Sequence, residues 1–320
     1  MERNPRYRRR AARWSALAGV LATVLVLAGC GGSTSPQAPE QGGPAGAAAP
    51  TQANCTTKVP DASAVRQALA AANAGDTICV TGDSDDARLV VDKGGSDGSP
   101  ITVLGTGKTA AKGITIEADN VVVDGFLADE PEAPGASILG SNVTLRNTTI
   151  NRPIGDDYDG IRFWGNNIRI LHNTITDTRN DNKAHADCMQ TFATDDDHPA
   201  SQGVLIDGNR CEKIANNCLI AEGPNSEAGD GSGDGESKNF TFSNNYCENK
   251  ASQAVLADDI KHMVITGNQV VGRINHAWAL QNESTDAEIR DNQVRSVKYE
   301  VGMDDSSEDG YQGPESGGGP

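Results

Sequence analysis

The sequence is poor in basic side chains and contains no apolar stretch long enough to cross a bilayer. Its 320 residues include 27 lysines and arginines against 44 aspartates and glutamates, which gives a formal net charge of −17. This balance excludes nucleic acid as the expected partner, because phosphate groups would be repelled. An acidic polysaccharide would be repelled as well, unless Ca²⁺ bridges the two sets of carboxylates or a local basic patch overrides the mean.

The one long apolar run lies near the N-terminus. Residues 17–28 follow an arginine-rich segment and are too few to span a bilayer comfortably, so residues 1–29 are predicted to be an export signal. Residues 27–30, Leu-Ala-Gly-Cys, resemble the lipobox of bacterial lipoproteins. The resemblance implies that Cys30 carries a diacylglyceryl group; an ordinary signal with an incidental cysteine is the alternative. Removal of residues 1–29 takes away six arginines and Glu2, and the net charge becomes about −22.

The remaining chain divides into three parts. Residues 30–54 are rich in Gly, Pro, Ala and Gln without apolar periodicity, which predicts a flexible tether after the lipidated Cys30. Residues 55–302 carry the periodic pattern of a folded domain, and residues 303–320 are acidic and glycine-rich, which predicts a disordered tail. We therefore expect a domain on the extracellular face of the bacterial cell membrane, held there by the lipid anchor only.

A short phrase recurs through the second half of the chain: an apolar residue, two variable residues, Asn, one variable residue and an apolar residue. The asparagines of these copies are Asn173, Asn209, Asn245, Asn268 and Asn292, with weaker copies around Phe126 and Thr148. Successive copies lie 22 to 25 residues apart, except for two intervals of 36. This period is typical of a solenoid with two insertions, in which the asparagines would stack as an amide ladder at a bend.

The segment before the repeats has helical character. Residues 62–74 are alanine-rich, place Val65 and Leu69 on one face and follow Asp61 as an N-cap. Gly75 and Asp76 end this helix, and strands and turns follow.

These phrases, with the helix before them, resemble the pectate-lyase-like right-handed parallel β-helix superfamily over residues 55 to about 300. The resemblance implies an all-β, single-stranded solenoid with a short N-terminal capping helix, and an extracellular polysaccharide as partner. A sandwich or a propeller is the alternative, but either would favour hairpin turns and no asparagines in register.

Six cysteines remain once Cys30 is assigned to the lipid, and an even number in an exported chain predicts disulfides. Equivalent positions in adjacent coils lie about 5 Å apart, which permits bonds between coils. The predicted pairs are Cys55–Cys79, Cys188–Cys218 and Cys211–Cys247. Buried, unbonded thiols are the alternative for the last two pairs.

Alignment of the coils stacks Asp159, Asp187 and Asn217. Two carboxylates one coil apart repel and raise at least one pKa, which is how an acid and a base arise from one residue type. The predicted catalytic set is His185, Asp187, Gln190, Arg162 and Asp159. The plainer interpretation is that these aspartates cap loops and that His185 bonds a turn carbonyl.

The residues from Asp159 to Ile161 are similar to part of a polygalacturonase motif, but the Gly-His-Gly and Arg-Ile-Lys of that family are absent. The absences favour lyase chemistry, in which a base removes the proton α to a uronate carboxylate while Ca²⁺ neutralises that carboxylate. The candidate bases are Arg162, Lys183 and His185, and the candidate calcium ligands are Asp156, Asp157, Asp195, Asp196 and Asp197. We therefore expect a uronate lyase; a non-catalytic surface protein that binds glycan or protein, and a glycoside hydrolase with paired carboxylates, are the alternatives.

Overall fold

The computed structural model describes residues 54–155, 157–179, 185–226 and 235–320. The predicted export signal, Cys30 as the predicted lipidation site and all but the last residue of the predicted tether lie outside the described residues. Within the described part of the chain, no helix is long and apolar enough to span a membrane.

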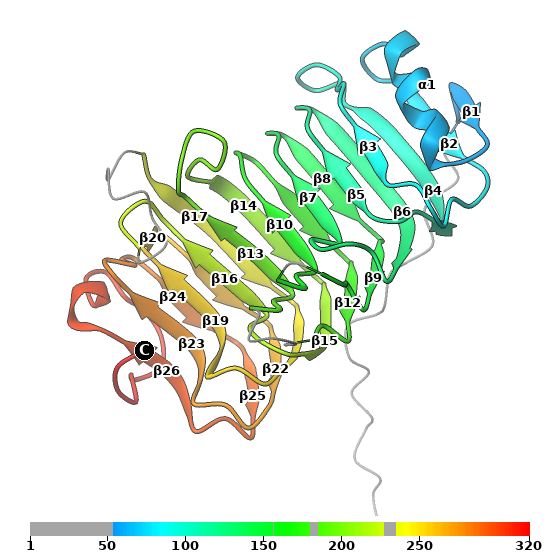
Figure 1. Cartoon of the computed structure of the whole chain (residues 1–320). Helices are drawn as coiled ribbons and strands as arrows, with labels where there is room; N and C mark the ends of the chain where they lie inside the picture. Colours follow the sequence, from blue (N-terminus) through cyan, green and yellow to red (C-terminus); the bar gives the residue numbers. More distant parts are fainter. Residues whose placement is uncertain (1–53, 156, 180–184, 227–234) are drawn as a thin grey trace, which may run out of the picture. The chain divides into compact units, whose positions relative to one another are not determined.

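A short cap begins the domain, as predicted. It consists of β1 (Thr57–Val59), the 3-10 turn η1 (Ala62–Ala64) and α1 (Val65–Ala71). Asp61 Oδ1 accepts hydrogen bonds from the backbone N–H of Ser63 (2.9 Å) and of Ala64 (3.3 Å). Val65 and Leu69 are fully buried, so α1 closes the first end of the core (Figure 1).

Two parallel sheets follow the cap. The first, called here the β3–β26 sheet, contains in order β3 (Leu89–Val91), β5 (Ile114–Ile116), β7 (Ala136–Ile138), β10 (Ile161–Phe163), β13 (Met189–Phe192), β16 (Leu219–Glu222), β19 (Gln253–Asp258), β23 (His276–Gln281) and β26 (Tyr299–Met303). Each of these strands pairs in parallel with the next one, a coil further along the chain.

The second sheet, called here the folded sheet, supplies the other walls of the coils. Besides β1 it contains β2 (Thr77–Val80), β4 (Ile101–Ala110), β6 (Val121–Asp129), β8 (Val143–Arg146), β9 (Thr149–Asn151), β11 (Arg169–Leu171), β12 (Thr174–Thr176), β14 (Gln202–Asp207), β15 (Arg210–Ile214), β17 (Ser237–Ser243), β18 (Tyr246–Asn249), β20 (Ile260–Lys261), β21 (Val264–Thr266), β22 (Gln269–Val271), β24 (Glu288–Arg290) and β25 (Gln293–Arg295). Together the sheets form about ten coils, and the predicted all-β right-handed parallel β-helix is confirmed.

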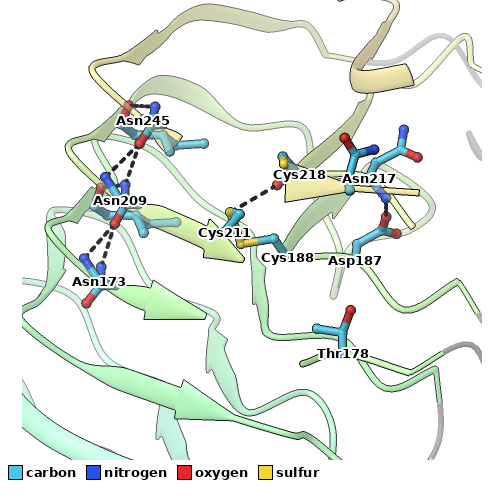
Figure 2. Close-up of a disulfide and its surroundings, with 12 residues drawn as sticks. Asn173, Thr178, Asp187, Cys188, Asn209, Cys211, Asn217, Cys218 and Asn245 are labelled. Carbon is cyan, nitrogen blue, oxygen red and sulfur yellow. Dashed lines mark hydrogen bonds between the residues drawn. A yellow bond between two sulfur atoms is a disulfide. The ribbon is translucent and has the colours of Figure 1, made fainter. Parts of the chain in front are cut away.

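The repeated asparagines lie in register at a bend of the folded sheet, as predicted (Figure 2). Asn209 Oδ1 accepts from the backbone N–H of Asn173 (2.8 Å) and from its Nδ2 (3.1 Å), and Asn209 Nδ2 donates to Asn245 Oδ1 at 3.0 Å. The same bonds continue to Asn268 and Asn292. The ladder satisfies buried amide groups that the turn would otherwise leave without partners.

The turn before each ladder asparagine uses the left-handed backbone region. His172 has φ 54° and Gly208 has φ 65°. At the second position a Cβ would lie 2.3 Å from Nδ1 of His172, so a larger residue there would have to displace this exposed imidazole ring.

The cysteine pairing differs from the prediction in two of three pairs. Cys55–Cys79 is present, but Cys188 bonds Cys211, and Cys218 and Cys247 are free and buried. The prediction that Cys211 and Cys247 occupy equivalent positions in adjacent coils is confirmed, because they are register partners. The predicted bond between them is wrong. Cys211 points into the interior of the coil and bonds Cys188 on the other side of that interior, and not its register partner in the adjacent coil.

The C-terminal segment 303–320 is ordered, so the prediction of a disordered tail is wrong. Met303 ends β26, and a 3-10 turn, η3 (Asp305–Ser307), follows it. Further on, the backbone N–H of Gln312 donates to Ala287 O at 2.8 Å, and Tyr311 packs against the core. The last coil of a solenoid exposes unpaired backbone groups and apolar side chains, and this segment covers them, whereas composition alone indicates solubility and not docking.

Candidate functional site

Three side chains stack at the corner that precedes the β3–β26 sheet, and we call them the acidic ladder: Asp159, Asp187 and Asn217. The backbone N–H of Asp187 donates to Asp159 Oδ1 at 2.8 Å, and the backbone N–H of Asn217 donates to Asp187 Oδ1 at 2.7 Å. Figure 2 shows the second of these bonds. The predicted stacking is confirmed, and it arises because β10, β13 and β16 pair in register.

Asp159 is held as an ion pair in a buried position. Arg162 Nε donates to Asp159 Oδ2 at 2.7 Å, and its Nη2 donates to Asp157 Oδ2 at the same distance. Burial raises the pKa of the Asp159 carboxyl to about 6, although the neighbouring guanidinium opposes the shift. Asp159 is therefore mainly ionised at neutral pH and becomes neutral in mild acid.

Asp187 is shifted further toward its neutral form than Asp159. Its Oδ1 accepts from the backbone of Asn217 and from Asn216 Nδ2 (2.9 Å), while its buried Oδ2 has no hydrogen-bond partner among the described residues. Burial, and then the charge of Asp159, raise the pKa of Asp187 well above its usual range. The pair therefore favours a neutral Asp187 beside a charged Asp159, the combination that general acid and base chemistry needs.

The structure brings four of the five predicted catalytic residues together. Gln190 is the register partner of Arg162 and is buried beside it. His185 is exposed, and within the described residues no hydrogen bond or ion pair joins it to the acidic ladder. Lys183, the other candidate base, lies outside the described residues. The catalytic role of these residues stays a prediction.

The predicted calcium ligands do not form one site. Asp157 precedes β10, whereas Asp195, Asp196 and Asp197 follow β13, so the two groups lie at opposite edges of the β3–β26 sheet; Asp156 lies outside the described residues. Asp195 Oδ1 instead accepts from the backbone of Asp197 (3.0 Å) and from the backbone and ring of His198 (2.9 Å each), which makes it a turn cap. Over the described ranges, no group of three or more His, Cys, Asp or Glu could hold a metal ion.

A pocket of about 400 Å³ adjoins the acidic ladder, and the sequence prediction did not include it. We call it the cationic pocket; its lining comprises Asp177, Thr178, Arg179, Lys213, Glu248, Asn249, Lys250, Val271 and Gly272. Thr178 Oγ1 donates to Ala186 O (2.8 Å), and Asn249 Nδ2 donates to Asn216 O (3.0 Å). These bonds place the pocket at the turn that carries Asp187 and its neighbours.

The three cations of this pocket come from three successive coils. Arg179 and Lys250 follow the last strand of the folded sheet in their coils and precede the β3–β26 sheet, whereas Lys213 lies on β15, next to its last residue. An alignment of that turn, and not only of the asparagine phrase, would have found Arg179 and Lys250. A pocket of about 370 Å³ at the opposite edge is lined by Asp195, Asp196 and Glu236 among others, so the two edges of the sheet differ in charge.

Comparison with known proteins gives a fold and no family. No family model matches the sequence, and no curated protein matches it. The chain is similar to a solved mannuronic-acid-specific polysaccharide family 6 lyase from human gut microbiota, with 13% identity and a TM-score of 0.56 over 75% of this chain and 60% of that one. The shared feature is the parallel β-helix.

Two further solved structures show weaker likenesses. An alginate lyase from Paenibacillus sp. has 13% identity and a TM-score of 0.48 over 80% of this chain and 98% of that one. A family 6 alginate lyase has 12% identity and a TM-score of 0.47 over 77% of this chain, which spans only 40% of that lyase.

Proposed function

We propose that this protein binds an extracellular acidic polysaccharide along the β3–β26 sheet and cleaves it by β-elimination, as a uronate lyase. The observation that carries the proposal is that the cationic pocket adjoins the acidic ladder. The lining of this pocket has three cations against two carboxylates, one of which, Asp177, lies 3.7 Å from Lys213 Nζ; this local excess of positive charge attracts a polyanion that the net charge of −17 would otherwise repel. The similar lyase fold supports a polysaccharide as the substrate class.

The reaction assigns a separate task to each group. A base takes the proton from the carbon next to the uronate carboxylate, the electron pair forms a carbon–carbon double bond, and the bond to the leaving sugar oxygen breaks as that oxygen gains a proton. Lys213, Lys250 and Arg179 neutralise the carboxylate, which makes the proton more acidic. His185, which is exposed, is better placed to meet a sugar as base than the buried Asp159. No step is assigned to calcium, because the described residues do not provide its ligands.

The acidic ladder then acts through Arg162. Asp159 and Asp157 fix this guanidinium at the outer face, where its side chain is 13% exposed, next to Gln190. Arg162 can turn one N–H group toward a sugar carboxylate or hydroxyl, since an arginine has five donors. The pair of carboxyl groups positions Arg162 and sets the local charge.

A second function, binding without cleavage, is favoured by one observation. Asp159 and Asp187 are both 0% exposed, and each Oδ1 accepts a backbone N–H from the next coil, as expected of a structural ladder. A protein of this kind would hold a polysaccharide in the cationic pocket and would leave it intact.

Incubation of the purified full-length protein with polymannuronate, polyguluronate and polygalacturonate separates these functions. A lyase produces the ultraviolet absorbance of an unsaturated uronate with at least one polymer. We expect His185→Ala to lower that rate by about 10²-fold or more, the usual contribution of a general base. The double variant K213Q/K250Q should weaken binding of the same polymer, whereas Lys58→Gln, which changes an exposed lysine on β1, should leave both unchanged.

The outcomes are distinct. Binding without new absorbance would support the second function. Neither binding nor absorbance with any polymer would contradict both functions.

We also propose that the protein is a lipoprotein on the extracellular face of the bacterial cell membrane, attached through Cys30. The short apolar run and the Leu-Ala-Gly-Cys sequence at its end support this proposal.

A further inference from the structure

Four cysteines lie in the interior of two adjacent coils. Cys188 precedes β13 and Cys218 precedes β16, and the register of these strands makes the two residues neighbours along the solenoid. Cys211 on β15 and Cys247 on β18 are direct register partners. Cys218 and Cys247 are therefore related to one another as Cys188 and Cys211 are, one coil further along.

The first of these two pairs is a disulfide whose Cα atoms are 5.8 Å apart, within the usual range for such bonds. Cys218 and Cys247 are both fully buried, and the Cys247 thiol is near enough to contribute to the raised pKa of the Cys218 thiol. We propose that Cys218 and Cys247 form a disulfide stacked on the Cys188–Cys211 bond. This inference does not depend on the proposed function.

The competing pairings are less favourable. Bonds along the solenoid, Cys188–Cys218 and Cys211–Cys247, would require the existing Cys188–Cys211 bond to break. Figure 2 shows the sulfur of Cys211 directed to Cys188 across the coil, while the carbonyl oxygen of Cys218 lies 4.0 Å from that sulfur.

The bond forms by thiol–disulfide exchange with an oxidised thiol–disulfide oxidoreductase or a small disulfide such as oxidised glutathione. One cysteine thiolate attacks the oxidant to give a mixed disulfide, and the second thiolate then attacks the protein sulfur. The oxidant leaves as two thiols and has accepted two electrons and two protons. Burial raises the pKa of the Cys218 thiol, so the thiolate is scarce in the folded protein, and we expect the reaction to precede closure of this coil.

The second bond would reinforce the acidic ladder. Cys188 follows Asp187, and Cys218 follows Asn217, whose backbone N–H bonds that aspartate. With both disulfides formed, the residues that follow Asp187 and Asn217 are linked covalently to strands β15 and β18 of the folded sheet.

The test uses the full-length chain with Cys30→Ser, which removes the cysteine predicted to carry lipid. The reduced, unfolded protein is refolded with reduced and oxidised glutathione, alkylated in denaturant without reduction, digested and analysed by mass spectrometry. We expect a peptide that joins Cys218 to Cys247, together with the Cys55–Cys79 and Cys188–Cys211 peptides. The same digest of protein exported through an oxidising compartment applies if refolding yields are low.

Two results would overturn the proposal. One is alkylation of both Cys218 and Cys247 while the Cys188–Cys211 peptide is present. The other is recovery of the Cys188–Cys218 and Cys211–Cys247 peptides in its place.

A comparison of melting temperatures tests the proposed disulfide independently. Under oxidising conditions the double variant C218S/C247S should melt on the order of 10 °C below its parent, since a bond that closes a loop of this size stabilises the fold substantially. The difference should shrink when both proteins are fully reduced. A difference that persists undiminished after reduction would reflect the serines and would count against the bond, and C55S/C79S serves as the control for loss of an established disulfide.

Discussion

At the scale of single residues, Asp159 and Asp187 show how contacts divide one residue type into two chemical states. Both carboxyl groups are fully buried and both accept backbone N–H groups. Asp159 also faces the Arg162 guanidinium, which favours its charged form, whereas Asp187 has a buried oxygen without a hydrogen-bond partner among the described residues. Asp187 therefore binds a proton more strongly than Asp159 does.

This difference predicts the effect of pH on stability. The folded protein binds protons at both sites more tightly than the unfolded chain, so the free energy of unfolding falls as pH rises from about 4 through the folded pKa values. For Asp159 alone, a rise in pKa from 3.8 to about 6 corresponds to a loss of about 3 kcal/mol, complete above pH 6. Asp187 extends the loss to higher pH.

We expect Asp187→Asn to remove its part of this loss while keeping an oxygen that can accept the two hydrogen bonds. The stability of the variant relative to the natural protein should therefore rise with pH, by up to about 1.4 kcal/mol per pH unit. Urea unfolding of both proteins between about pH 4 and pH 8 measures it. Parallel curves would show that Asp187 is ionised in the folded protein and would contradict the assignment.

At the scale of elements, the bend of the folded sheet depends on the asparagine ladder more than on strand propensity. The strands on either side of the bend are short, such as β11 (Arg169–Leu171) and β12 (Thr174–Thr176). Asn209 alone links three coils, through bonds to Asn173, Ile170 O and Asn245. Linking adjacent coils in this way requires a short side chain that has both a hydrogen-bond donor and an acceptor.

Asn209→Ala should therefore destabilise the fold by about 3 kcal/mol or more, because it leaves several buried groups without partners. Asn275→Ala is a matched control, since Asn275 is exposed and no described side-chain hydrogen bond involves it, and it should change stability by no more than about 0.5 kcal/mol. Thermal or urea unfolding followed by circular dichroism measures both. Equal effects of the two substitutions would show that the ladder contributes little.

At the scale of the whole molecule, the net charge and the predicted lipid anchor determine which partners the protein can bind. The net charge of −17 repels polyanions at a distance, while the cationic pocket attracts them at contact. The predicted diacylglyceryl group at Cys30 would supply two acyl chains, enough for stable membrane attachment where a single chain is marginal.

Cys30→Ser should consequently move the protein from the membrane fraction to the soluble fraction of cells that express the full chain. Fractionation and an immunoblot measure the distribution, and mass spectrometry of the N-terminal peptide shows whether lipid is present. Ser33→Ala is the control and should leave the protein with the membrane. Membrane retention of the serine variant would contradict the anchor.

Much of the fold could be predicted from local patterns. The spacing of Asn173, Asn209 and Asn245 identified equivalent positions in successive coils, and hence the stacking of Asp159 over Asp187. The predictions that failed depend on the direction in which side chains point, which the periodicity of the sequence does not specify. Cys188 and Cys218 are neighbours along the solenoid as predicted, yet the bond forms across the coil.

The amino-acid sequence by itself determined the coil, because burial of one apolar set per repeat and one asparagine per bend admits a single register. Only the tertiary structure decided which side chains meet across a coil, how the 303–320 segment covers the open end, and which parts of the chain supply Arg179, Lys213 and Lys250 to one pocket. The reason is physical: register is set by a repeat that can be counted along the chain. The direction of a side chain within a coil, and the docking of an aperiodic segment, depend on neighbours that the chain brings together only when it is folded.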